Sequence, residues 1–207
     1  AGAIAGGSGG FAEAFAVDTS AATIDALRDA ADAAASSPQA VAENWIKAYP
    51  CCLQTHGAID AALAAGPAAQ RSERITVIVH PLSRKAAALD GVADGLQAKF
   101  SIPYLTAYSL LHGAPDLDSF ARVDPAASAL ATRVRVRIDP ALALAEAVLE
   151  VDGTTAARVT APLGSPANPL DREALAGKVR ALAGGALDGA LDDPDRPAAT
   201  LLEMLLR

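Results

Sequence analysis

The spacing of apolar residues changes along the chain and predicts both strands and helices. Apolar and polar residues alternate over Ile75 to Val79 and over Arg133 to Ile138, as expected of half-buried strands. Two further extended stretches, Ala145 to Val151 and Thr155 to Thr160, flank Asp152-Gly153, a dipeptide typical of tight hairpin turns. These stretches predict a sheet of about four strands, most of them antiparallel.

Apolar residues at intervals of three and four predict helices before, between and after the strands. Ser101, Pro103 and Gly113 have the character of a cap, a first-turn proline and a helix stop. The predicted fold is therefore α+β, a mostly antiparallel sheet with helices packed on one face. The expected helices span Ser20 to Ala35, Leu53 to Ala65, Ser101 to His112, Leu117 to Arg122, Asp171 to Ala183 and Ala198 to Leu206, with a short apolar stretch at Phe11 to Ala16.

The charge of the chain limits its partners. A formal net charge of -7 argues against non-specific binding to nucleic acid or to an anionic membrane. An anionic substrate therefore needs a local basic pocket, and Arg84 and Lys85 form the densest small basic group. No apolar run is long enough to span a bilayer, and no basic residue precedes Arg28 to begin a signal peptide. We expect a soluble, cytoplasmic protein.

The two cysteines, Cys51 and Cys52, are adjacent in the sequence. Neighbouring side chains point apart, so this spacing rarely closes a disulfide. Two thiols are also too few for an iron–sulfur cluster held by cysteines. We expect both to be small packing residues of a protein in a reducing compartment.

One stretch, Lys47 to Asp60, combines residue types that acid-base chemistry uses. Pro50 disfavours the helical conformation for Tyr49, so this segment is expected to be extended and a helix to begin after it. His56 then falls in the first helical turn, where the amide dipoles favour the neutral imidazole. A neutral imidazole accepts a proton near neutral pH, so His56 is a candidate general base. By default, a histidine in an alanine-rich helix is a packing or capping residue.

Several separated motifs together resemble the MmgE/PrpD family. They occur in the family's order over nearly the whole chain. Members of that family include 2-methylcitrate dehydratase, cis-aconitate decarboxylase and related epimerases, which act on small polycarboxylates without a metal cofactor. The motifs are Lys-Ala-Tyr-Pro-Cys-Cys at 47–52, Thr-His at 55–56, Ala-Lys-Phe-Ser-Ile-Pro-Tyr at 98–104, Leu-Leu-His-Gly at 110–113, Asp152-Gly153, and Pro-Leu-Gly-Ser-Pro-Ala-Asn-Pro at 162–169 with the following helix that bears Lys178.

The resemblance implies a domain organisation. The family combines a large all-helical domain with a smaller α/β lid, and its active site lies between them. By resemblance, residues 45–161 form the lid, residues 1–44 are a remnant of the helical domain, and residues 162–207 are a linker and C-terminal helices that return to it. Most of the N-terminal helical part has no counterpart here. The chain begins at Ala1 without a methionine, which suggests processing, trimming or the middle of a longer polypeptide.

The resemblance also implies site residues. His56 matches the lid's active-site histidine, Tyr104 its active-site tyrosine, and Lys47 the basic residue of the same motif. We expect dehydration of a small polycarboxylate, with His56 as base or acid, Tyr104 as the proton donor or its positioner, and Lys47 anchoring a carboxylate. Arg84 and Lys85 are further candidates for binding substrate. We expect no cofactor, and either a homodimer or association with a helical-domain partner.

Other interpretations stay open at this point. Tyr104 would by default belong to the core, and Arg84 and Lys85 to a solvated turn. His80 and His112 are most simply a strand end and a charge partner at a helix C-terminus. Decarboxylation and epimerisation share with dehydration the removal of a group next to a carboxylate. The chain could also be a non-catalytic fragment, a vestigial paralogue or the binding subunit of a split enzyme.

Overall fold

The computed structural model describes residues 20–35 and 44–187, together with residues 189, 192, 193, 195, 197, 200 and 204. Contacts divide the chain into two compact units, Ala1–Asn44 and Trp45–Arg207. In the first unit, helix α3 spans Ala21–Ala35 and begins where the sequence predicts. The apolar stretch expected at 11–16 and most of the helix expected at 198–206 lie outside the described residues. The domain boundary expected after residue 161 stays a prediction.

The second unit is built on a four-stranded sheet with the strand order β2-β1-β3-β4. Its strands are β1 (Ile75–Val79), β2 (Val134–Ile138), β3 (Ala147–Val151) and β4 (Thr154–Val159). The β1–β3 and β3–β4 pairs are antiparallel, whereas β1 and β2 run parallel. The predicted α+β fold with a mostly antiparallel sheet is confirmed. The parallel pair was not predicted, because a long crossover of helices connects its strands.

The hairpin between β3 and β4 turns at the dipeptide that predicted it. Asp152 and Gly153 have φ angles of 50° and 87°. Both angles lie in the left-handed region, which glycine adopts freely and aspartate tolerates better than most residues. Asp152 also accepts a hydrogen bond from the backbone N–H of Arg74, at 3.0 Å, and so ties the turn to the start of β1.

The helices of this unit mostly follow the sequence prediction. Three short helices, α6, α7 and α9, were missed because none is long enough to show a helical period. Each begins after a side chain that caps it, His80 for α6, Asp94 for α7 and Asp124 for α9. The full set is η1 (Leu53–Thr55), α5 (His56–Ala65), η2 (Pro67–Arg71), α6 (Pro81–Ala86), α7 (Gly95–Ala98), α8 (Ile102–His112), η3 (Asp118–Phe120), α9 (Pro125–Ala131), α10 (Arg172–Ala183) and η4 (Gly184–Leu187).

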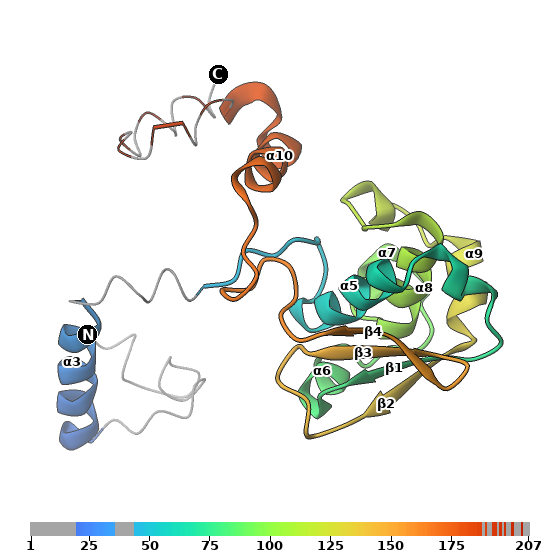
Figure 1. Cartoon of the computed structure of the whole chain (residues 1–207). Coiled ribbons are helices and arrows are strands. Elements are labelled where there is room, and N and C mark those ends of the chain that lie inside the picture. The colour runs from blue at the N-terminus through green and yellow to red at the C-terminus, as the bar shows by residue number, and fades with distance from the viewer. Residues whose placement is uncertain are drawn as a thin grey trace. The chain divides into compact units, whose positions relative to one another are not determined.

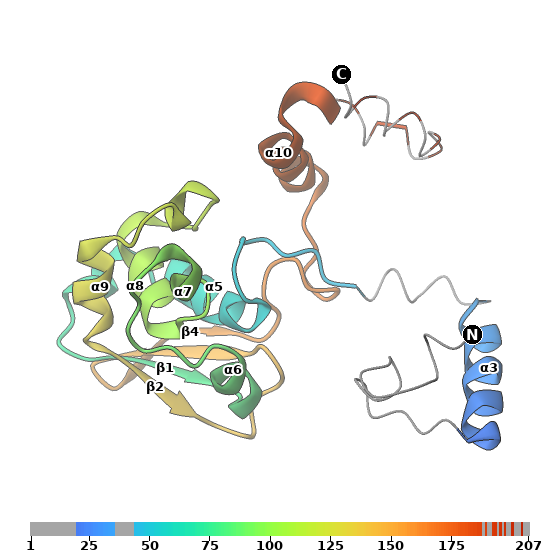
Figure 2. The ribbon, with the colours of Figure 1, turned by 180° about the vertical axis from the view of Figure 1, so that it is seen from behind.

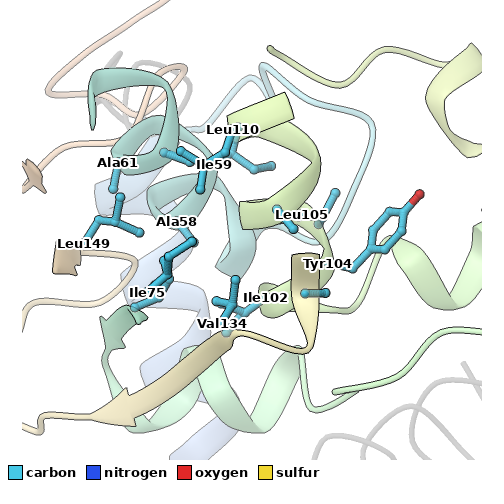
Figure 3. Packing of buried hydrophobic residues seen from close by; sticks show 14 of the residues in the cluster. Ala58, Ile59, Ala61, Ile75, Ile102, Tyr104, Leu105, Leu110, Val134 and Leu149 are labelled. Atoms are coloured by element: carbon cyan, nitrogen blue, oxygen red, sulfur yellow. The ribbon is translucent and has the colours of Figure 1, made fainter. Parts of the chain in front are cut away.

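The main core lies between one face of the sheet and helices α5 and α8, which both views place over that face (Figures 1 and 2). Ile59 of α5 and Leu105 of α8 are fully buried, as are Ile75 and Leu149 of the sheet (Figure 3). Burying each such side chain contributes about 1.5–3 kcal/mol. Alanines fill the rest of α5 and let it approach the sheet closely, so its first turn is firmly placed. No helix among the described residues has the length and apolar character needed to cross a membrane.

Candidate active site around His56

His56 is the first residue of α5 and follows directly on the short helix η1. Its side chain is fully buried, with 0% of its surface exposed. Neither ring nitrogen makes a hydrogen bond of good geometry to any described residue. A buried polar group without a partner is costly, and such groups are rare in folded proteins. His56 is therefore a stronger functional candidate than its place in an alanine-rich helix indicates.

The turn before His56 is held by its own polar side chains. Thr55 donates a hydrogen bond to the carbonyl of Cys52 at 2.7 Å, and its hydroxyl lies 3.2 Å from the Cys51 sulfur. The Cys52 N–H donates to the Lys99 carbonyl at 3.0 Å. Both cysteines are free thiols, and Cys51 is buried, as the sequence predicts. These contacts fix the direction in which α5 begins, and with it the place of the imidazole.

Tyr49 lies against His56. The two ring centroids are 5.1 Å apart, and the ring planes are inclined at 59°. The hydroxyl of Tyr49 donates a 2.5 Å hydrogen bond to Asp60, which lies one turn after His56 on α5. Asp60 uses its other oxygen to accept from the N–H of Leu163 at 2.7 Å. Burial raises the pKa of both Tyr49 and Asp60 above their ordinary values, and their mutual hydrogen bond raises that of the tyrosine further.

The segment before Tyr49 is joined to the linker after β4. The N–H of Ile46 donates to the carbonyl of Gly164 at 2.9 Å. Gly164 has a φ of 87°, and a Cβ atom there would lie 2.0 Å from the Ile46 carbonyl oxygen. Only glycine fits this position. Two segments far apart in the sequence thus meet beside the start of α5.

The electrostatic surroundings of His56 keep its ring neutral. Burial is the main cause that lowers the pKa of His56 from 6.5 to about 4. The positive charge of Lys47 acts in the same direction, and Lys178 of α10 adds a smaller effect. Backbone groups of Tyr49 and Leu163 partly oppose the shift. The neutral imidazole expected from the helix dipole is present at pH 7, but burial is its leading cause.

A pocket of about 330 Å³ has Tyr49 and Leu163 in its lining. Its wall is largely apolar and includes Ala48, Pro50 and, from α10, Ala174. Lys178 and Asp116 also line it and supply its charged side chains. The pocket has the size of a small-molecule site, and its lysine also acts on His56.

The structure brings only one other predicted site residue to His56. Lys47 is exposed and lies close enough to lower the histidine's pKa. Tyr104 is 1% exposed and stands at the edge of the labelled core residues in Figure 3. Its hydroxyl accepts a 2.9 Å hydrogen bond from the N–H of Asp124, and its ring lies 6.2 Å from that of Tyr108. These contacts differ from those of His56, so the catalytic role of Tyr104 stays a prediction.

Arg84 and Lys85 lie in the last turn of α6. Arg84 forms an ion pair with Asp90 at 2.9 Å and lines a separate pocket together with Arg135 and Arg137, while Lys85 is exposed. This pocket shares no lining residue with the one beside Tyr49. The substrate-binding role of Arg84 and Lys85 also stays a prediction.

Sequence reasoning missed Tyr49, Asp60, Leu163 and Lys178 as parts of this site. Asp60 left a local signal, because it is the one acidic residue in α5 and stands four positions after His56. Leu163 and Lys178 belong to the C-terminal motif that resembles the family, but nothing local indicated that folding brings them near the start of α5. Among the described residues, no group of three or more His, Cys, Asp or Glu side chains is arranged to hold a metal ion.

Fold and site define an α+β domain in which a buried, neutral histidine opens a helix beside a small pocket. A family model described as the MmgE/PrpD C-terminal domain matches residues 49–203. The match covers more than half of the chain, and the chain belongs to the MmgE/PrpD family. No significant match to a curated protein was found.

Proposed function

We propose that this chain is the lid part of a lyase that dehydrates a small polycarboxylate such as 2-methylcitrate, with His56 as the acid-base residue. The observation that carries the proposal is the imidazole itself, which is fully buried, has no hydrogen-bond partner of good geometry and is neutral at pH 7. Keeping such a group costs stability, so a function is the natural explanation for it. Membership of the MmgE/PrpD family supports a polycarboxylate as the substrate.

Dehydration requires a base that removes a proton, an acid that protonates the departing hydroxyl, and cations that hold the substrate carboxylates. In the proposal, His56 takes the proton from the carbon next to a carboxylate, while the hydroxyl on the neighbouring carbon leaves as water and a carbon–carbon double bond forms. Tyr104 protonates the departing hydroxyl or positions it. The hydroxyl oxygen of Tyr104 already accepts a hydrogen bond from Asp124, which leaves its own proton available.

Cations hold the substrate in this proposal. Lys47 and Lys178 are the two positive charges that lower the pKa of His56. A substrate carboxylate that pairs with them cancels that effect, so the histidine becomes a stronger base once substrate is bound. Lys47 thus anchors a carboxylate and couples substrate binding to the basicity of His56.

Activity in this proposal requires the helical domain of the family as well, whether it belongs to the same polypeptide, to a second copy or to another protein. His56 is fully buried against Tyr49 and Leu163, two residues that also line the pocket. One of these two segments therefore moves when substrate and helical domain are in place.

The test is turnover of 2-methylcitrate and of cis-aconitate by this chain, alone and mixed with a separately expressed helical half from a family member. Absorbance of the unsaturated product reports dehydration, and product analysis separates it from decarboxylation and epimerisation. We expect the mixture to be active and His56→Ala to abolish the activity.

Turnover by the chain alone would refute the requirement for a helical domain. A folded chain that is inactive in both settings would refute the lyase proposal and favour a binding subunit or a vestigial paralogue. Retained activity in the His56→Ala mixture would remove His56 from the mechanism.

A further inference from the structure

Asp60 occupies an unusual position in α5. It is the one acidic residue of a helix otherwise built from His56, glycine and apolar side chains. It follows His56 by four residues, so the two side chains lie one above the other on the same helix face. The face that carries the candidate base therefore also carries a carboxylate one turn away.

Each oxygen of Asp60 holds a different segment of the chain. Oδ1 accepts the hydrogen bond from the hydroxyl of Tyr49, 11 residues before it, and Oδ2 accepts from the N–H of Leu163, 103 residues after it. Both oxygens of this partly buried carboxyl group have a hydrogen-bond partner, as buried polar groups require. Asp60 thus clamps two segments that local chain geometry does not bring together.

The two clamped residues are the ones that enclose His56. The Tyr49 ring packs against the imidazole at 5.1 Å, and backbone groups of Tyr49 and Leu163 lie near enough to act on its proton affinity. The same two residues also line the 330 Å³ pocket. The backbone hydrogen bond from Ile46 to Gly164 joins the same two segments, but Asp60 is the side chain that bonds to Tyr49 and Leu163 themselves.

We infer that Asp60 is a positioning residue, which orients His56 and controls access to it by holding Tyr49 and the Leu163 segment in place. The inference rests on the proposed function for its catalytic meaning, because it assigns Asp60 to the same site. The clamp keeps the imidazole in one orientation while the base is at rest. Release of either hydrogen bond frees a segment that covers the fully buried imidazole.

The charged and titratable groups around His56 affect the proton affinity of its ring, and therefore its measured reactivity. Lys47 acts from the segment before α5, and Lys178 from α10. Tyr49 and Asp60 share the hydrogen bond described above, and Cys51 lies beside Tyr49. The variants below leave the two lysines unchanged, so a change in His56 reports the clamp.

The experiment introduces Tyr49→Phe and Asp60→Asn separately into the full-length chain and compares each variant with the wild type. Tyr49→Phe removes one hydroxyl and keeps the ring against His56. Tyr108→Phe is the matched control, since it removes the hydroxyl that donates to Ser119 at 2.9 Å in the same unit. The probe is diethyl pyrocarbonate at pH 6.5, which modifies accessible neutral imidazoles. Mass spectrometry follows each histidine, with His80 and His112 as internal references.

We expect the wild-type chain and Tyr108→Phe to protect His56 equally. In Tyr49→Phe and Asp60→Asn the modification rate of His56 rises by roughly tenfold, whereas His80 and His112 react as before. If Asp60→Asn fails to fold, Tyr49→Phe alone decides. Protection of His56 in a folded Tyr49→Phe equal to that in Tyr108→Phe overturns the inference.

A kinetic measurement separates this inference from the proposed function. In the active mixture with a helical half, Tyr49→Phe lowers kcat and leaves KM unchanged, because the base is misplaced while the lysines still bind substrate. If no mixture turns over substrate but His56 is deprotected as expected, the clamp stands and the lyase proposal fails. If the mixture is active and His56 stays protected in both variants, the lyase proposal stands and the clamp fails.

Discussion

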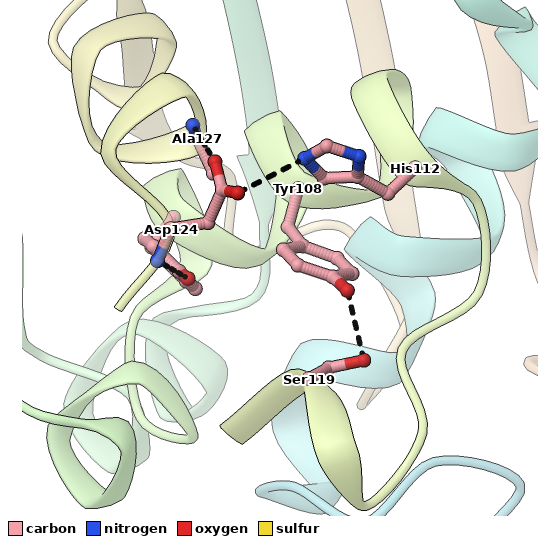
Figure 4. Close-up of polar contacts among 6 residues, drawn as sticks. Tyr108, His112, Ser119, Asp124 and Ala127 are labelled. Carbon is pink, nitrogen blue, oxygen red and sulfur yellow. Dashed lines mark hydrogen bonds and ion pairs between the residues drawn. The ribbon is translucent and has the colours of Figure 1, made fainter. Parts of the chain in front are cut away.

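Two histidines of the same domain lie in opposite surroundings. His56 begins α5, is fully buried and makes no hydrogen bond of good geometry. His112 ends α8, its side chain is 40% exposed, and its Nε2 lies 3.4 Å from a carboxylate oxygen of Asp124 (Figure 4). Asp124 also caps α9 by accepting from the N–H of Ala127 at 2.7 Å. One histidine is paired with a carboxylate at a helix junction, and the other is enclosed against the backbone of Tyr49 and Leu163.

The difference separates a structural role from a functional one. Around His112, the Nε2 atom has a carboxylate partner, and the hydroxyl of the neighbouring Tyr108 donates to Ser119 at 2.9 Å (Figure 4). Such a network stabilises the junction of α8 and α9. The imidazole of His56 has no side-chain partner of good geometry among the described residues, so a substrate can use it.

The largest expected effect concerns catalysis. In the active mixture with a helical half, His56→Gln lowers kcat by about 100- to 10,000-fold, the usual contribution of an acid-base group. His112→Gln leaves kcat within about twofold of wild type, because its contacts are confined to the α8–α9 junction. Steady-state kinetics of both variants measures the contrast. An equal decrease in kcat in the two variants would show that the two histidines do not differ in function.

The second prediction concerns acid stability. An unfolded histidine takes up its proton near pH 6.5, whereas folded His56 does so only near pH 4. Between these values the unfolded state binds more protons, so stability falls as the pH drops. The loss amounts to about 2 kcal/mol between pH 7 and pH 5.

Urea unfolding at pH 7, 6 and 5 tests this. His56→Leu should lose most of the pH dependence in this range, while His112→Gln should retain it. A His56→Leu protein with the wild-type slope would show that another group controls acid unfolding.

A smaller effect is expected at the α9 cap. Asp124→Ala removes the cap and the partner of His112 and should lower the free energy of unfolding by about 1 kcal/mol. Asp124→Asn is the control, because asparagine caps a helix about as well as aspartate and should lose much less. Chemical denaturation of the three proteins compares them. A loss in Asp124→Asn as large as in Asp124→Ala would assign the effect to charge and not to capping.

The smallest effect belongs to His112. Its pair with Asp124 is partly exposed, at 40% and 31%, and exposed ion pairs contribute little. His112→Gln should change the free energy of unfolding by less than about 0.5 kcal/mol at pH 7. The same denaturation series measures it. A loss above about 1 kcal/mol would show that this histidine supports the fold more than its contacts indicate.

Local signals in the sequence were sufficient for most elements of the fold. The cap and stop of α8 and the turn at Asp152-Gly153 were predicted from residues within one turn of each boundary. The same local reasoning placed His56 in the first turn of a helix. It did not find α6, α7 or α9, which are too short for a periodic pattern, nor the parallel pairing of β1 with β2.

The sequence by itself determined where helices and strands begin and that a histidine opens α5, because capping, proline and turn preferences act between neighbouring residues. Only the tertiary structure decided that His56 is fully buried, since its enclosure involves Leu163, more than a hundred positions away. It also decided that Asp60 links Tyr49 to Leu163 and that Tyr104 faces Asp124. Contacts of this kind follow from how whole elements pack, which no local pattern of residues specifies.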